Sequence, residues 1–137
     1  MVGYQRQKEI LFVCIENSSR SQMAEGFARS KGVRASSAGT SPAGEVDPFV
    51  IQVMAERGVD ISHNRPKLLT PEMVDRASLV VLTDALLKDS LPKEIHKKIG
   101  KKLVVWSVAD PRGQPIEVVR FVRDKIQQDV DLLIRKV

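Results

Sequence analysis

The sequence predicts an α/β fold, a three-layer sandwich with a four-stranded parallel sheet and helices on both faces. Two observations predict it. Short apolar runs alternate with helical patterns, strand then helix, four times over. Strands joined through helices pair in parallel, and their helices pack on both faces of the sheet. The 137 residues contain no internal repeat, low-complexity tract or linker, so we expect one domain spanning 1–137.

The first strand and the first helix are predicted near the start of the chain. Residues 9–14 (EILFVC) form a short run with β-branched and aromatic side chains, which is typical of a buried strand. Residues 19–31 carry apolar side chains at helical spacing, namely Met23, Ala24, Phe27 and Ala28. Ser19 and Gln22 match a capping box at the start of this helix, and Gly32 is its expected stop.

The middle of the chain contains a candidate second strand, residues 33–37, and two helix starts. Asp47 before Pro48 predicts a helix, because aspartate caps the first turn and proline is tolerated at its first position. Thr70 before Pro71 predicts a second, shorter helix in the same way.

The last third of the chain completes the alternation. Residues 79–82 and 103–106 are apolar runs that predict the third and fourth strands. The segment 84–100 between them is helical in pattern but broken at Pro92. From residue 115 to the end, a long amphipathic helix is predicted by apolar residues at every third or fourth position, namely Ile116, Val119, Val122, Ile126, Val130, Leu133 and Ile134.

The composition points to a soluble protein with an anionic ligand. Lys and Arg exceed Asp and Glu by 22 to 17, a net charge of +5, which favours partners such as phosphate groups. The basic residues are scattered and aromatic residues make up only 4%, so we expect no nucleic-acid partner. No apolar run approaches the ~20 residues of a membrane helix. Residues 1–8 lack the apolar stretch of a signal peptide, so we expect a cytoplasmic protein that binds no membrane.

A candidate anion site follows the first strand. With one cysteine and two histidines, an internal disulfide is excluded and a zinc site is not expected. Cys14 ends the strand, where ligands bind in parallel sheets, and the next loop leads into a helix N-terminus, which attracts anions. No glycine lies between Cys14 and Met23, so nucleotide-binding glycine patterns are absent. The expected phosphate-binding residues are Ile15, Glu16, Asn17, Ser18, Ser19, Arg20 and Ser21.

The spacing of Cys14 and Arg20 suits attack on phosphorus. The five residues between them can fold their N–H groups around three phosphate oxygens, with Cys14 beneath the phosphorus atom. Arg20 can hold two of these oxygens bidentately. The positive field favours a nucleophilic thiolate, to which Ser21 can donate a hydrogen bond. Because this charge comes from the protein, we expect neither a metal nor an organic cofactor.

A general acid is needed for the leaving alcohol. Asp110, before Pro111, follows the fourth strand at the same edge of the predicted sheet. The plain alternative is an ordinary turn before a helix, where Asp-Pro is common. Together with the cysteine loop, the pattern favours the acid.

These segments resemble the low-molecular-weight protein tyrosine phosphatases, a superfamily shared with the thioredoxin-coupled arsenate reductases. The similarity covers nearly the whole chain. In the order of the family it includes FVCIENSSRSQMAEGFAR, SAGTSP, VMAERGVDISHNR, SLVVLTD and the Asp-Pro before the last helix.

The resemblance implies a role for each matching position. Cys14 would be the nucleophile that forms a phosphocysteine, and Arg20 would bind phosphate and stabilise the transition state. Asp110 would protonate the leaving group and then activate water. Two further residues, Ser37 and His63, match positions that hydrogen-bond to the loop asparagine, here Asn17.

Asn17 and Asp84 match family positions as well. Asn17 would hold the unusual backbone of the loop, because asparagine adopts left-handed backbone angles at a lower energetic cost than most residues. Asp84 ends the third strand, where the family also has an acidic residue, and it receives no firm role.

Several positions depart from the family pattern. Glu16 stands where the family has glycine, so its carboxylate would repel an acidic substrate or point to solvent. Ser19 replaces a cysteine that protects the nucleophile as a disulfide. Arg112 and residues 42–44 occupy places where tyrosine-specific members carry aromatics, so no slot for a phosphotyrosine ring is visible. Members acting on phosphoarginine have threonine at the position of Ser18, and serine leaves that substrate open.

The expected function is hydrolysis of phosphate monoesters, first of all protein phosphotyrosine, by a monomer that forms a phosphocysteine. Its expected partners are a phosphorylated protein or a small phosphomonoester as substrate, and inorganic phosphate or similar oxyanions as product or inhibitor. No metal is expected.

Two other functions compete with this one. Arsenate mimics phosphate, but the relay cysteines of the thioredoxin-coupled members are absent, since Asp84 and Leu91 occupy the matching region. An arsenate reductase of this sequence would therefore need an external thiol. A non-enzymatic phosphate- or nucleic-acid-binding module is the third possibility, and the joint presence of Cys14, Arg20, Ser21 and Asp110 argues against it.

Overall fold

Four parallel strands form the centre of the molecule, as shown by a computed structural model that describes residues 9–137. The strands are β1 (Glu9–Cys14), β2 (Arg34–Gly39), β3 (Leu79–Leu82) and β4 (Leu103–Val105). Their order in the sheet is β2-β1-β3-β4, and every pairing is parallel. The predicted four-stranded parallel sheet is therefore confirmed. Compared with the predicted strand at residues 33–37, β2 starts one residue later and ends two residues later.

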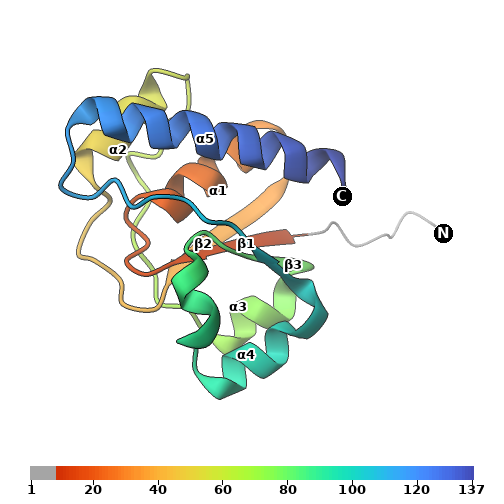
Figure 1. Ribbon diagram of the computed structural model, residues 1–137. Helices are drawn as coiled ribbons and strands as arrows, with labels where there is room; N and C mark the ends of the chain where they lie inside the picture. Colours follow the sequence, from red (N-terminus) through yellow and green to blue (C-terminus); the bar gives the residue numbers. More distant parts are fainter. Residues whose placement is uncertain (1–8) are drawn as a thin grey trace.

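Helices cover both faces of this sheet, which confirms the predicted sandwich (Figure 1). One layer is made of α1 (Arg20–Ser30), α2 (Pro48–Ala55) and α5 (Ile116–Arg135), and the other of α3 (Pro71–Arg76) and α4 (Lys93–Ile99). Successive side chains of a strand point to opposite faces. Ile10 and Phe12 consequently join the core beneath α1, α2 and α5, whereas Leu11 and Val13 join the core beneath α3 and α4.

The helix boundaries follow the local capping signals, with one exception. Asp47 accepts a hydrogen bond from the Phe49 N–H, and Thr70 accepts one from the Met73 N–H, as their sequence patterns predict. Ser19 is the N-cap of α1, but its side chain makes no capping hydrogen bond. The predicted capping box is therefore wrong, because the Gln22 side chain is used elsewhere. The segment broken at Pro92 forms two pieces, the 3-10 helix η2 (Ala85–Asp89) and α4, and the short η3 (Gly100–Lys102) precedes β4.

The strand order places the candidate site at the middle of the sheet. β1 lies between β2 and β3, so the connection after β1 leads to one neighbour and the connection after β2 leads to the other side of β1. Parallel sheets bind ligands at the carboxyl end of the strands at such a point. Cys14 ends β1, and Asp84 and Asp110 follow β3 and β4 at the same edge.

No helix within residues 9–137 is long and apolar enough to cross a membrane. The N-terminal residues 1–8, on which the expected lack of a signal peptide depends, lie outside the part of the chain that the structure describes.

Candidate active site

Cys14 is buried at the floor of the loop that joins β1 to α1. Its side chain has polar neighbours despite its burial: the Asn17 N–H donates to Sγ at 3.1 Å, and the Ser21 hydroxyl lies 2.8 Å from Sγ. Asn17 Nδ2 donates to the same hydroxyl oxygen at 2.8 Å. Because the hydroxyl proton of Ser21 is not used in that bond, it is available to Sγ. Two hydrogen-bond donors, the Asn17 N–H and the Ser21 hydroxyl, are therefore directed at the sulfur.

The loop directs its amides toward Cys14. Four of its carbonyls accept hydrogen bonds from the segment 40–47, at 2.8 to 3.2 Å, and these are the carbonyls of Cys14, Ile15, Glu16 and Ser18. Peptide groups are planar and trans, so the N–H that follows each of these carbonyls points the opposite way. The amides of the loop are therefore turned away from the segment 40–47, and the Asn17 N–H on Sγ shows where they point. Such a ring of N–H groups binds oxyanions.

Two backbone features make this loop shape possible. Asn17 has a φ of 53°, the left-handed region that asparagine reaches more easily than most residues and that the sequence analysis expects. Gly39, at the end of β2, lies against the loop so closely that a Cβ there would be 2.5 Å from the Ile15 carbonyl oxygen. Only glycine fits at that position without displacing the loop.

The braces of Asn17 differ from those expected. Its Oδ1 accepts from the Lys67 N–H at 2.9 Å and from Gln22 Nε2 at 3.2 Å. Ser37 and His63 do not hold Asn17: the Ser37 hydroxyl donates to Glu25 at 2.6 Å, and His63 is exposed.

The reason for this correction lies in the chain segment that reaches the loop. Backbone of residues 64–67 approaches Asn17, so a main-chain N–H takes the place expected for the histidine. Gln22 is fully buried and joins that segment to the loop, because its Oε1 accepts from Asn64 at 3.0 Å. Sequence reasoning missed Gln22 and Lys67 in this role. The sequence shows a glutamine two positions after the arginine, and the structure adds that this glutamine is fully buried.

The protein holds the Arg20 guanidinium by hydrogen bonds from one nitrogen, Nη1. Nη1 donates to Asp84 Oδ2 at 3.1 Å and to the Val108 carbonyl at 2.8 Å. Nε is buried and has no hydrogen-bond partner, the one such side-chain nitrogen or oxygen within residues 9–137. Nε and Nη2 form the edge that binds two oxygens of an oxyanion side by side.

Asp84 gains a role that the sequence did not assign. Its Oδ1 accepts from the Leu86 N–H at 2.9 Å while Oδ2 accepts from Arg20. The first turn of η2 thus fixes a carboxylate that in turn orients the arginine. An acidic residue at the carboxyl end of a central strand was the signal for it.

Asp110 faces Arg20 from the segment between β4 and α5. Its Oδ2 is 3.8 Å from Arg20 Nη2, and its Oδ1 accepts from the Arg112 N–H at 3.0 Å. The side chain is 46% exposed, so water can reach the carboxyl group. The Arg112 guanidinium pairs with the Glu16 carboxylate across the mouth of the site, and Glu16 therefore neither points freely to solvent nor stands as an unpaired charge.

A small cavity of about 40 Å³ lies above Cys14. It is lined by Cys14, Ile15, Glu16, Ser18, Ser19, Arg20, Asp110 and Arg112. No aromatic side chain of the described residues lines it, in agreement with the missing aromatic slot.

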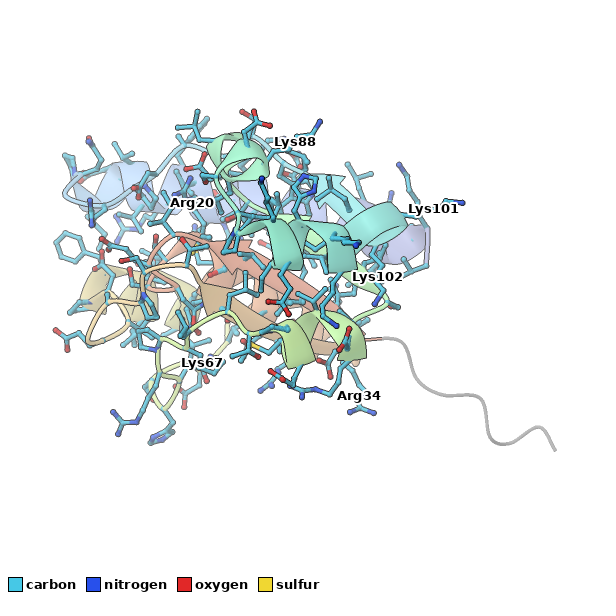
Figure 2. All side chains as sticks on the ribbon, turned by 90° about the horizontal axis from the view of Figure 1, so that it is seen from below. Arg20, Arg34, Lys67, Lys88, Lys101 and Lys102 are labelled. Atoms are coloured by element: carbon cyan, nitrogen blue, oxygen red, sulfur yellow. The ribbon has the colours of Figure 1, made fainter. Side chains whose placement is uncertain are left out.

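Basic side chains are distributed over several elements outside the site. In Figure 2, Lys67 stands in the loop before α3, Lys88 in η2, and Lys101 and Lys102 in η3. Arg20 differs from them because its side chain is only 5% exposed. Of the two arginines that line the cavity, Arg20 is thus the buried one and Arg112 the exposed one.

Comparison with known proteins shows which family the chain resembles over the described residues. The family described as "Low molecular weight phosphotyrosine protein phosphatase" matches residues 9–137. A glutaredoxin arsenate reductase of Synechocystis sp. is 34% identical over 133 residues, which cover 95% of this chain and 98% of that protein.

Two solved structures share the fold closely. The YwlE arginine phosphatase of Geobacillus stearothermophilus superposes with a TM-score of 0.86 at 32% identity, over 94% of this chain and 92% of the other. A low molecular weight protein tyrosine phosphatase of T. tengcongensis also has a TM-score of 0.86, at 30% identity, over 96% of this chain and all of the other. Proteins of one architecture thus carry three different activities.

Proposed function

The chain belongs to the low molecular weight phosphotyrosine protein phosphatase family, and we propose that it hydrolyses phosphate monoesters through a phosphocysteine at Cys14. One observation carries the proposal. Arg20 lines the cavity above Cys14, and its buried Nε has no hydrogen-bond partner among the described residues. A buried N–H without a partner costs about 1–3 kcal/mol, and an oxyanion in the cavity removes that cost.

In the first step the thiolate of Cys14 attacks phosphorus. The S–P bond forms as the bond from phosphorus to the leaving oxygen breaks, and the protonated carboxyl of Asp110 gives its proton to that oxygen. The charge on the three remaining phosphoryl oxygens is stabilised by the loop amides and by the free edge of Arg20. The products of this step are the free alcohol and the phosphocysteine.

In the second step the Asp110 carboxylate takes a proton from a water molecule. The water oxygen attacks phosphorus, the S–P bond breaks, and the thiolate of Cys14 leaves with the help of the Ser21 hydroxyl. Inorganic phosphate is released and Asp110 is protonated again. The partly exposed position of Asp110 suits this exchange of alcohol for water.

Protein phosphotyrosine is the proposed substrate, with the chain acting as a monomer without metal or cofactor. The T. tengcongensis relative supports this choice by its name. The YwlE relative is named an arginine phosphatase, and Ser18 together with a cavity free of aromatic lining fits phosphoarginine as a substrate as well. A panel of peptides carrying phosphotyrosine, phosphoserine or phosphoarginine separates these substrates by kcat/KM.

Arsenate reduction is the second candidate, favoured by the likeness to the Synechocystis reductase. Arsenate binds as phosphate does; Cys14 forms an S–As bond as one As–O bond breaks, and the departing oxygen leaves as water with a proton from the carboxyl group of Asp110. Because the chain has a single cysteine, an external thiol must attack the sulfur of that adduct. Arsenic then leaves as arsenite, having gained two electrons, and Cys14 forms a mixed disulfide that a second external thiol reduces.

Hydrolysis of p-nitrophenyl phosphate by the wild type and by Cys14→Ser tests the proposal. We expect turnover by the wild type and its loss in the variant. Pure wild-type protein without turnover would exclude the phosphatase, and turnover retained by Cys14→Ser would exclude the mechanism. Consumption of glutathione that depends on arsenate, measured with the same two proteins, tests the second candidate.

A further inference from the structure

An ion pair joins two segments of the site that are distant in the sequence. Glu16 belongs to the phosphate-binding loop, and Arg112 follows Asp110 in the segment between β4 and α5. In Figure 1 this segment passes close to the start of α1, where the phosphate-binding loop ends. The two side chains therefore connect the loop that holds the phosphate with the segment that holds the acid.

The acid has few other restraints. Val108 is anchored in the sheet edge, because its N–H donates to the Thr83 carbonyl at 3.3 Å and its carbonyl accepts from Arg20. Pro111 is buried, but Asp110 on one side and Arg112 on the other are exposed. Within the described part of the chain, residues 109–114 make two polar side-chain links to the phosphate-binding loop and its helix. One is the Glu16–Arg112 pair, and the other is the 3.8 Å approach of Asp110 to Arg20.

Arg112 also touches the acid directly. Its backbone N–H donates to Asp110 Oδ1 at 3.0 Å. The orientation of that N–H is set by the peptide plane between Pro111 and Arg112. The ion pair with Glu16 restrains the side chain of the same residue, Arg112. Fixing the guanidinium on Glu16 thus fixes the donor that orients the carboxyl group of Asp110.

We infer that the Glu16–Arg112 pair is a clasp that positions Asp110 over the phosphate-binding loop. The inference rests on the proposed function, and it makes Glu16 and Arg112 positioning residues. The clasp thus forms a charged link between the two halves of the site.

The exposure of the pair sets the size of the effect. The Glu16 side chain is 31% exposed and the Arg112 side chain 60% exposed. Ion pairs of this kind contribute up to about 1 kcal/mol, which corresponds to about fivefold in a rate. The clasp therefore adjusts the acid step and is not required for phosphate binding.

The experiment compares Glu16→Gln, Arg112→Gln and the charge-exchanged double variant, Glu16→Arg with Arg112→Glu. Phenyl phosphate and p-nitrophenyl phosphate are the substrates. Phenolate is a more basic leaving group than p-nitrophenolate, so its departure depends more on proton donation by Asp110. For the single variants we expect kcat/KM on phenyl phosphate to fall about two- to fivefold, with a smaller loss on p-nitrophenyl phosphate. Inhibition by inorganic phosphate stays unchanged, and the double variant recovers the loss.

Two controls make the result specific. Arg57→Gln removes another exposed arginine from an ion pair, the one that Arg57, just past the end of α2, makes with Asp124 of α5, and it should leave both substrates unaffected. In an Asp110→Asn background, Glu16→Gln should add no further loss, because residues that act through one another are not additive. Equal losses on both esters, an additive loss in that background, or weaker phosphate inhibition would overturn the clasp.

A readout without turnover separates the clasp from the proposed function. Nitrogen-15 relaxation reports the mobility of the amides of residues 110, 112 and 113. We expect lower order parameters in Glu16→Gln than in the wild type or Arg57→Gln. If the wild type hydrolyses neither ester, the proposed function fails. The order parameters still show whether the Glu16–Arg112 pair restrains the segment that holds Asp110. Unchanged order parameters overturn it.

Discussion

Arg20 is the residue on which the chemistry of the site converges. One of its nitrogens is used by the protein, through Asp84 and the Val108 carbonyl, and the opposite edge is left for a ligand. The protein contacts hold the guanidinium plane in place before a substrate arrives. Such pre-organised donors are worth more than the same groups on a mobile side chain.

Arg20→Lys tests this division of labour. Lysine keeps the charge but presents a single ammonium, which cannot hold Asp84, the Val108 carbonyl and two phosphoryl oxygens together. We expect kcat/KM for p-nitrophenyl phosphate to fall about 100- to 1,000-fold, as when one oxyanion donor is lost. Inhibition by inorganic phosphate should weaken in parallel. Near wild-type activity in Arg20→Lys would show that charge alone is sufficient.

Individual site residues differ in how well the sequence predicts them. Cys14, Arg20 and Ser21 lie within eight positions of one another, so their meeting is a local property of one loop. One partner of Asn17, the Lys67 N–H, comes from 50 positions away, and its identity depends on how that segment packs against the loop. Glu16 and Arg112 are 96 positions apart, and no sequence pattern relates one to the other.

The contact between α2 and α5 is secured by charge as well as by apolar packing. Arg120 and Arg123 of α5 both donate to Glu56, just past the end of α2, at 2.8 and 2.6 Å. These hydrogen bonds, the one from Arg120 first, hold the pKa of Glu56 at about 2, below its ordinary 4.5. Arg123 is itself buried and also donates to the Val53 carbonyl at 3.0 Å.

The lowered pKa of Glu56 makes part of the stability depend on pH. A carboxyl group with a lower pKa in the folded state stabilises the fold above its unfolded pKa, and the effect is lost as the pH falls. Wild type should therefore be more stable than Glu56→Gln above pH 4.5, and the difference should shrink between pH 4.5 and about 2. Urea unfolding at a series of pH values measures it.

Glu94→Gln is the matched control, because it removes an exposed carboxylate on α4 and changes the net charge equally. A difference between wild type and Glu56→Gln that stays constant through this pH range would contradict the account.

The elements themselves were largely predictable, since their signals are local. β1 and β3 have the predicted bounds, and Asp47 and Thr70 cap helices as their neighbours suggest. The capping box at Ser19 was not formed, because the buried Gln22 side chain bonds to Asn17 and to the Arg65 carbonyl. A local pattern is overridden there by a tertiary contact that brings in a segment about forty residues away.

For the molecule as a whole, the sheet order brings the functional residues together. Cys14 ends β1, and Asp84 and Asp110 follow β3 and β4. Parallel pairing places all three at one edge of the sheet, and the order β2-β1-β3-β4 makes their strands neighbours. The net charge of +5 favours the approach of anionic substrates. Binding itself falls to the buried Arg20 and to the loop amides.

The most direct test of the proposed mechanism is the detection of phosphate on Cys14 during turnover. Wild type and Asp110→Asn are mixed with p-nitrophenyl phosphate and quenched in acid, and the peptide that contains Cys14 is analysed by mass spectrometry. Phosphate should be found on Cys14 in both proteins, and at a higher fraction in Asp110→Asn if loss of the carboxylate slows hydrolysis of the phosphocysteine more than its formation. Turnover without phosphate on Cys14 in either protein would contradict the account.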